Sequence, residues 1–214
     1  MNVFIFLNGS KSSPPFYREH FETYRNARDT VVCADGGYKL AQQCGIKPDI
    51  VVGDLDSLRD DEIEKGVEVR AYPRNKDYSD FELAMRSAEE MAPAWIYVYG
   101  ALGGRKDHEL TNILLLSSVK QSTVFIEEGL EIYGVHEELL ILDRKNCICS
   151  LLALGGPCHV KEIRGFAFAL KDEVLYPSSR GLSNIVTKDE AVISLIHGSL
   201  IAVVNREGGE VRSL

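Results

Sequence analysis

Short hydrophobic segments alternate with amphipathic, helix-like segments up to about residue 128. The hydrophobic segments are short and rich in β-branched and aromatic residues, which is typical of buried strands. They lie at Val3 to Leu7, Thr30 to Ala34, Ile50 to Val52, Glu68 to Ala71, Trp95 to Tyr99 and Thr123 to Ile126. Strands that alternate with helices form parallel sheets through crossover connections. The pattern therefore predicts an α/β fold, a Rossmann-like parallel sheet with helices on both faces.

The intervening segments carry signals for the starts and ends of helices. The sequence Ser12 to Pro15 places prolines at the first helical positions, and Ser79 to Glu82 has the form of a capping box. Gly45 follows a second helix-like segment, where glycine commonly ends a helix. These signals predict helices between the strands.

After Gly129 the hydrophobic pattern changes to short strands separated by Gly, Asn, Asp and Pro. The strands are expected at Glu131 to Val135, Glu138 to Leu142, Cys147 to Leu154, Val160 to Ile163, Phe166 to Leu170, Ala191 to Ile196 and Leu200 to Val204. Such spacing is typical of an antiparallel sandwich or barrel. We therefore expect two domains, 1–128 and 129–214, the second an all-β sandwich.

Composition narrows the class of protein. The chain has 214 residues, 45% of them hydrophobic and 26% charged, which is ordinary for a globular protein. A net charge of -8 gives no broad basic surface for nucleic acid, and no apolar run reaches the roughly 20 residues of a membrane span. We expect small molecules or other protein chains as partners, no membrane and no nucleic acid.

The five cysteines favour a reducing, cytoplasmic location, because their number is odd and they form no C-x-x-C pair. Cys147, Cys149, Cys158 and His159 could in principle bind a metal. Cysteines that alternate along an apolar strand are more often packing groups. We favour packing for them.

Aspartates gather in the loops that follow the predicted strands. Ligands of an open parallel sheet bind beyond the carboxyl ends of its strands, so these loops are candidates for a site. They carry Asp35, Asp54, Asp56, Asp77, Asp80 and Asp107. Singly, each could be a turn residue or complement a helix dipole.

Together, these aspartates indicate a bound cation. Two carboxylates about 5 Å apart repel by about 3 kcal/mol at an effective dielectric of about 20. Carboxylate-rich sites suit Mg²⁺, which is commonly shared between one or two protein carboxylates and the phosphates of a substrate. The pattern therefore favours phosphoryl or diphosphoryl transfer.

Donors for phosphate are also present. The backbone of Gly103 and Gly104 could approach an anion closely, and Arg105, Lys76 and Arg74 could neutralise its charge. The glycines could instead form a plain turn. The sequence contains no P-loop, no G-x-G-x-x-G turn and no G-x-S-x-G elbow, which argues against the commonest ATPase, dehydrogenase and hydrolase families.

Four of these loops, in order and spacing, resemble the thiamine pyrophosphokinase family. The family's A-D-G-G, G-D-x-D-S, K-D-x-T-D and G-G-R-x-D-H motifs correspond to Ala34 to Gly37, Gly53 to Ser57, Lys76 to Asp80 and Gly103 to His108. Ser79 stands where the family usually has threonine, and Arg180 to Asn184 resembles its C-terminal G-x-S-N segment. Some members stack thiamine on a C-terminal tryptophan, which this chain lacks.

The resemblance implies an enzyme that transfers the diphosphate of ATP to the hydroxyethyl oxygen of thiamine, with Mg²⁺ bound. It implies a homodimer whose thiamine sites lie between subunits. The catalytic and metal-binding acids would be Asp54, Asp56, Asp80 and Asp107. The remaining nucleotide and thiamine contacts would be Asp35, Gly36, Gly37, Lys76, Asp77, Gly103, Gly104, Arg105, His108, Ser183 and Asn184.

Two alternatives keep the same aspartates. One is a pyrophosphokinase of the same fold that acts on another alcohol, such as a hydroxymethylpterin. The other is a non-catalytic sensor that binds thiamine or a nucleotide. Release of AMP separates enzyme from sensor, and exchange of the alcohol separates the two enzymes.

Overall fold

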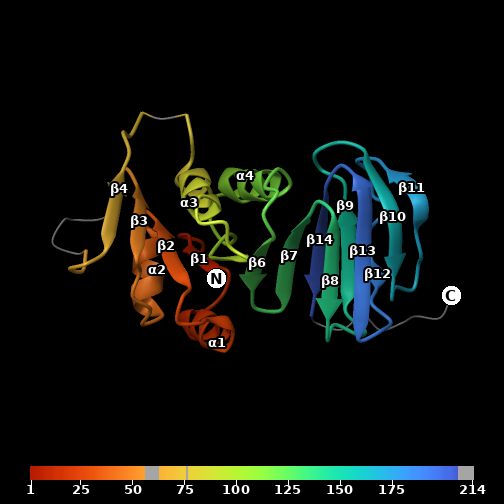
Figure 1. Ribbon diagram of the computed structural model, residues 1–214, viewed down its shortest axis with the longest axis horizontal. Coiled ribbons are helices and arrows are strands. Elements are labelled where there is room, and N and C mark those ends of the chain that lie inside the picture. Colours follow the sequence, from red (N-terminus) through yellow and green to blue (C-terminus); the bar gives the residue numbers. More distant parts are fainter. Residues whose placement is uncertain (56–62, 76, 207–214) are drawn as a thin grey trace. The chain divides into compact units, whose positions relative to one another are not determined.

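The computed structural model describes residues 1–55, 63–75 and 77–206 (Figure 1). The chain divides into two compact units. The first comprises Met1–Asn112 and Thr123–Glu128, and the second comprises Ile113–Ser122 and Gly129–Leu214. In the described ranges, no helix is long and apolar enough to cross a bilayer.

The first unit is built around a parallel sheet. Its strands are β1 (Val3–Phe6), β2 (Thr30–Ala34), β3 (Ile50–Gly53), β4 (Glu68–Ala71), β5 (Ile96–Tyr99) and β6 (Thr123–Glu127). They pair in parallel in the order β6-β5-β1-β2-β3-β4. Its helices are α1 (Pro14–Tyr24), α2 (Gly37–Gln43), α3 (Asp80–Glu89) and the first part of α4 (Lys106–Leu116). The predicted α/β architecture is confirmed.

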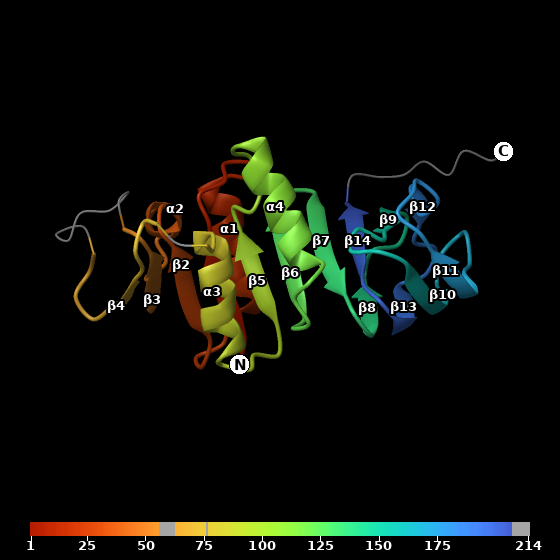
Figure 2. The ribbon, with the colours of Figure 1, turned by 90° about the horizontal axis from the view of Figure 1, so that it is seen from above.

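Helices cover both faces of this sheet (Figure 2). On one face, Phe4 of β1 meets Phe21 of α1 with ring centroids 4.8 Å apart. On the other, Phe125 of β6 meets Phe81 of α3 at 5.7 Å. Val98 of β5 is in register with Ile5 of β1 and with Phe125 of β6, so these three side chains lie on one face of the sheet. Phe4 precedes Ile5, and because side chains alternate along a strand, Phe4 lies on the other face.

The helix signals read from the sequence act largely as predicted. Helix α1 begins at Pro14, after Ser13. Helix α3 begins after Ser79, whose hydroxyl accepts the backbone N–H of Glu82 at 3.2 Å. The carboxylate of Glu82 binds Arg86 at 3.0 Å. The serine half of the capping box is therefore present.

The second unit contains two antiparallel sheets (Figure 1). Their strands are β7 (Leu130–Val135), β8 (Glu138–Leu142), β9 (Ile148–Leu152), β10 (Cys158–Arg164), β11 (Lys171–Leu175), β12 (Asn184–Ile185), β13 (Glu190–His197) and β14 (Leu200–Asn205). Within this unit the strand orders are β12-β9-β14-β7 and β11-β10-β13-β8. Along β8, Leu139 and Ile141 are buried while Leu140 and Leu142 are exposed. The alternation is that of a sheet with one buried face, as predicted for a sandwich.

One predicted strand is wrong. Phe166 to Leu170 forms no strand: Phe166 makes an isolated bridge with Val186, and Phe168 is 62% exposed. The strand begins instead at Lys171. Among the described strands, β11 pairs with β10 alone, and an edge strand accommodates polar side chains. The hydrophobic pattern indicated the more apolar neighbouring segment instead.

Candidate active site

A cavity of about 500 Å³ opens at the carboxyl edge of the parallel sheet. The strand order reverses between β1 and β5, since β2 to β4 extend to one side of β1 and β5 and β6 to the other. The loops on either side of such a reversal diverge and leave a crevice, which is where open α/β sheets bind ligands. The cavity is lined by Leu7, Asn8, Gly9, Ala34, Asp35, Gly36, Asp54, Arg74, Tyr78, Ser79, Asp80, Phe81, Gly100, Ala101, Gly104, Arg105, His108, Glu109 and Asn112.

Glycines let the loops after β1 and β5 pack backbone against backbone at this reversal. A Cβ on Gly9 would lie 2.0 Å from the carbonyl oxygen of Leu102. A Cβ on Gly103 would lie 2.2 Å from the backbone nitrogen of Lys11, and Gly103 also has a φ of +90°. Any side chain at either position would force these two loops apart.

Two aspartates converge on Gly53, the last residue of β3. A Cβ built on Gly53 would lie 3.1 Å from both the Oδ1 atom of Asp80 and the Cβ atom of Asp35. Asp80 is the first residue of α3, and Asp54 continues the chain directly after Gly53 into the cavity lining. The turn after β2, the end of β3 and the start of α3 therefore bring three carboxylates to one side of the cavity.

This carboxylate group fits a hard cation in its chemistry. The Oδ1 atom of Asp35 is buried, and no donor from the described residues reaches it. Three acidic, histidine or cysteine side chains close enough to hold a metal by themselves are not found in residues 1–55, 63–75 and 77–206. Mg²⁺ commonly takes only one or two protein carboxylates together with substrate phosphates and water. Such a donor set is compatible with Mg²⁺ shared with a phosphorylated substrate.

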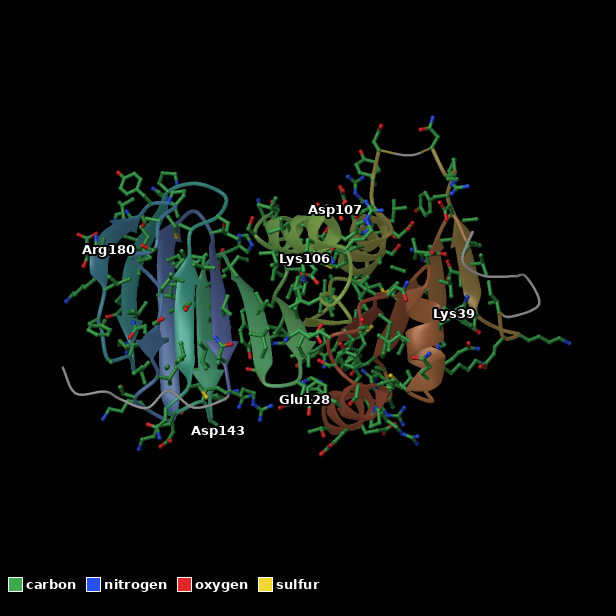
Figure 3. The ribbon with its side chains drawn as sticks, turned by 180° about the vertical axis from the view of Figure 1, so that it is seen from behind. Lys39, Lys106, Asp107, Glu128, Asp143 and Arg180 are labelled. Atoms are coloured by element: carbon green, nitrogen blue, oxygen red, sulfur yellow. The ribbon has the colours of Figure 1, made fainter. Side chains whose placement is uncertain are left out.

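The same lining carries positive charge, on Arg74 and Arg105. Arg105 binds the carboxylate of Asp107 through two hydrogen bonds of 3.1 and 2.5 Å. Those bonds lower the pKa of Asp107 to about 2. Figure 3 shows Asp107 beside Lys106 at the start of α4. Asp107 does not line the cavity and contacts the site through Arg105.

The backbone N–H groups of Gly103 and Gly104 bind a side chain of the protein. Both donate to Oε1 of Glu109, at 2.7 and 3.0 Å, and Oε2 of Glu109 accepts from Lys106 at 2.8 Å. The hydrogen bond from Lys106 is the main cause of a lowered pKa at Glu109. These two N–H groups, which the sequence suggested as phosphate donors, are thus engaged by a carboxylate.

The remaining candidates are distributed more widely. Gly36 and His108 line the cavity, whereas Gly37 is buried at the start of α2, where a Cβ would lie 1.9 Å from the carbonyl oxygen of Phe6. Asp77 is exposed and outside the lining. Asp56 and Lys76 lie outside the described residues.

Ser183 and Asn184 belong to the second unit. Ser183 is exposed, has a φ of +57° and donates its N–H to Ser150 at 3.0 Å. The side chain of Asn184 is buried and binds both the N–H and the carbonyl oxygen of Phe168, at 3.0 and 2.8 Å. In this structure Asn184, at the start of β12, therefore holds the segment around Phe168 between β10 and β11.

Several lining residues escaped the sequence analysis. Asn8 follows β1, and the rule that ligands gather at strand ends applies to it as it does to the aspartates. Asn112 lies one helical turn after His108 and donates to the carbonyl oxygen of Ala101 at 2.9 Å. The spacing of four residues on a helix could have indicated Asn112. Nothing in the sequence pattern indicates Tyr78, whose ring lies 3.8 Å from the guanidinium of Arg86.

Two family models match the chain. Residues 21–127 match the model described as thiamin pyrophosphokinase, catalytic domain, and residues 138–200 match thiamin pyrophosphokinase, vitamin B1 binding domain. The first match contains most of the cavity lining.

Curated relatives and solved structures agree with these matches. Thiamine pyrophosphokinase of Bacillus subtilis is 26% identical over 190 residues, which cover 84% of this chain and 89% of the relative. Thiamine pyrophosphokinase 1 of Oryza sativa is 27% identical over 198 residues, covering 76% and 74%. The crystal structure of the Bacillus subtilis protein superposes with a TM-score of 0.79 at 25% identity, covering 96% of this chain and 99% of that one. The Candida albicans thiamin pyrophosphokinase, 17% identical and covering 95% and 88%, shares the fold with a TM-score of 0.69.

Proposed function

The chain belongs to the thiamine pyrophosphokinase family, and from this premise we propose that it transfers the diphosphate of ATP to the hydroxyethyl oxygen of thiamine. The oxygen attacks the β-phosphorus of ATP, and the bond from that phosphorus to the α-phosphate bridging oxygen breaks. The products are thiamine diphosphate and AMP. The proton of the hydroxyl group passes to an aspartate or to solvent.

The observation that carries this proposal is the presence of carboxylates and guanidinium groups together in the lining of the cavity at the strand-order reversal. Asp35, Asp54 and Asp80 line this cavity, and so do Arg74 and Arg105. A triphosphate with a bound cation needs both: carboxylates for the cation, and guanidinium groups for the phosphate oxygens. We assign ATP to this cavity.

Within the proposal, Asp54 and Asp80 hold Mg²⁺ together with Asp56, and Asp35 completes the acidic side. When bound, Mg²⁺ neutralises phosphate charge and makes the phosphorus more electrophilic. Arg105, with Lys76, stabilises charge that develops on the transferred group. Asp107, expected among the metal-binding acids, fits better as the partner that fixes the orientation of Arg105, because both its oxygens bind that side chain.

Thiamine is assigned to the second unit, in which the vitamin B1 binding model matches. Ser183 stays the candidate contact there, while the hydrogen bonds of Asn184 suit a supporting role. We also propose a homodimer with thiamine bound between subunits. The buried, free cysteines suit a cytoplasmic enzyme.

The test is an assay of the purified protein with ATP, Mg²⁺ and thiamine, followed by chromatography of the nucleotides and thiamine esters. We expect AMP and thiamine diphosphate in equal amounts, with no product when thiamine is omitted or EDTA is added. ADP with thiamine monophosphate would show that a single phosphoryl group is transferred. Turnover of a hydroxymethylpterin but not of thiamine would assign a different alcohol.

A further inference from the structure

A buried carboxylate that the reaction does not use lies at the end of β6. Glu127 is 1% exposed and accepts hydrogen bonds from the hydroxyl groups of Ser12 and Tyr17, the latter at 2.5 Å, and from the N–H of Leu102 at 3.3 Å. Burial raises the pKa of Glu127, although these donors and Lys11 oppose the shift. A buried acid is costly unless its bonds serve the structure around it.

The hydroxyl groups of Ser12 and Tyr17 also accept hydrogen bonds from backbone N–H groups. Ser12 Oγ accepts from the N–H of Glu128 at 2.8 Å, and the hydroxyl of Tyr17 accepts from the N–H of Gly100 at 3.2 Å. Each hydroxyl therefore donates to the carboxylate and accepts from the chain. Such linked bonds strengthen one another in a buried setting.

This network joins the two loops that flank the strand-order reversal. Ser12 lies in the loop after β1, while Gly100 and Leu102 lie in the loop after β5. The same loops contribute Asn8, Gly9, Gly100 and Ala101 to the cavity lining. Glu127 does not itself line the cavity. It acts on the cavity only through the loops that it holds.

We propose that Glu127 is a positioning residue for the nucleotide: it holds the loops after β1 and β5 together, so that the floor of the ATP cavity is formed before ATP binds. The inference rests on the proposed function, because it takes the cavity to be the ATP site. Thiamine, assigned to the second unit, should be insensitive to this network.

A carboxylate is needed at this position because all three groups that face it are donors. In Glu127→Gln, one end of the side chain becomes an NH₂ group. If that group faces Leu102, two N–H donors oppose each other; if it faces Ser12 and Tyr17, both hydroxyl groups lose their acceptor. Either orientation leaves a buried donor unsatisfied and loosens at least one loop.

The test compares Glu127→Gln with Glu131→Gln, a matched change in the second unit. Glu131 is also buried, at 3% exposure, and binds Arg144 at 2.6 Å. Both variants should unfold at lower temperature than the unaltered protein. We expect the KM for ATP to rise about tenfold in Glu127→Gln only, with the KM for thiamine unchanged in both.

Binding of α,β-methylene ATP, measured by calorimetry, separates this inference from the proposed function. Weaker binding in Glu127→Gln but not in Glu131→Gln supports positioning even if the protein makes no thiamine diphosphate. Equal binding in the two variants, or equal rises in both KM values, would overturn it.

Tyr17→Phe gives a second variant in case Glu127→Gln does not fold. It removes one donor to Glu127 and the acceptor of the Gly100 N–H, and leaves the carboxylate in place. We expect the same selective loss of ATP affinity, smaller in size. Unchanged affinity for both ATP and α,β-methylene ATP in Tyr17→Phe would contradict the proposal.

Discussion

Gly53 has a backbone φ of +148°, a conformation that other residues rarely adopt. Its missing side chain also leaves the space into which Asp35 and Asp80 converge. A glycine at the end of β3 therefore allows the two acidic side chains to approach this point. Carboxylates gathered in this way suit a site that shares a cation with its ligand.

The change Gly53→Ala should cost both stability and activity. A methyl group would meet Asp80 Oδ1 at 3.1 Å, in addition to the strain of about 1–2 kcal/mol that a side chain incurs in such a conformation. Gly66→Ala is the matched control, because Gly66 also has a positive φ of +91° but has open space around it. Urea unfolding and the KM for ATP should show strain in both variants and loss of ATP affinity in Gly53→Ala alone. Equal ATP affinity in the two would show that the space beside Gly53 has no role.

His136 gives the molecule a pH dependence at the residue scale. Burial lowers its pKa below 6.5, and no described residue pairs with its buried Nε2 atom. Between the lowered pKa and about 6.5, the unfolded chain therefore binds more protons than the folded one. Stability should fall as the pH drops through this window and be unaffected by this group above it.

Replacing His136 with Gln should flatten that part of the pH profile. Urea unfolding midpoints measured between pH 5 and 7.5 would give the two slopes. The unaltered protein should lose more stability on acidification than His136→Gln does. Parallel profiles would show that another group causes the acid sensitivity.

At the scale of elements, the start of α3 links a helix cap to the site. Ser79 caps the helix, and Asp80 follows it directly into the cavity lining. Ser79→Ala should destabilise the protein by about 1 kcal/mol, whereas Ser79→Thr should change stability by only a few tenths. Urea unfolding measures both. If the alanine and threonine variants unfold alike, the hydroxyl bond to Glu82 contributes nothing to stability.

The sequence could predict those features of the fold that depend on residues close together in the chain. The cap at Ser79 and the proline start of α1 depend on neighbours within four residues, and both are present. The edge strand β11 was misplaced because its polarity reflects exposure in the folded sheet. Glu109 was missed as the acceptor of the Gly103 and Gly104 N–H groups, because its reach depends on the loop conformation before α4.

The other parts of the site depend on which strands, distant in sequence, are neighbours in the sheet. The sequence placed aspartates after successive strands, but only the sheet order shows that β1 and β5 are neighbours at the reversal. The loop after β1, with Asn8 and Gly9, carries no aspartate and was therefore overlooked, although it also follows a strand. Asp107 is adjacent in sequence to the lining residue His108, yet it does not line the cavity, and its carboxylate binds the lining residue Arg105.

At the scale of the whole molecule, two compact units share the chain. The two family models fall on 21–127 and 138–200, with the catalytic model over the α/β sheet and the vitamin-binding model over antiparallel strands. The packing division also assigns residues 113–122 to the second unit. The functional domains 1–128 and 129–214 remain a prediction, because packing alone does not assign a substrate to either unit.

The measurement that tests the account most directly compares Asp80→Asn with Glu89→Gln, a change at the exposed far end of the same helix. Both variants are assayed for AMP and thiamine diphosphate and unfolded in urea. We predict that Asp80→Asn lowers kcat/KM by roughly a hundredfold or more while the protein stays folded, because it removes one of the carboxylates assigned to the cation. Glu89→Gln should behave like the unaltered enzyme. Near-normal turnover by folded Asp80→Asn would contradict the assignment of this cavity as the site of diphosphate transfer.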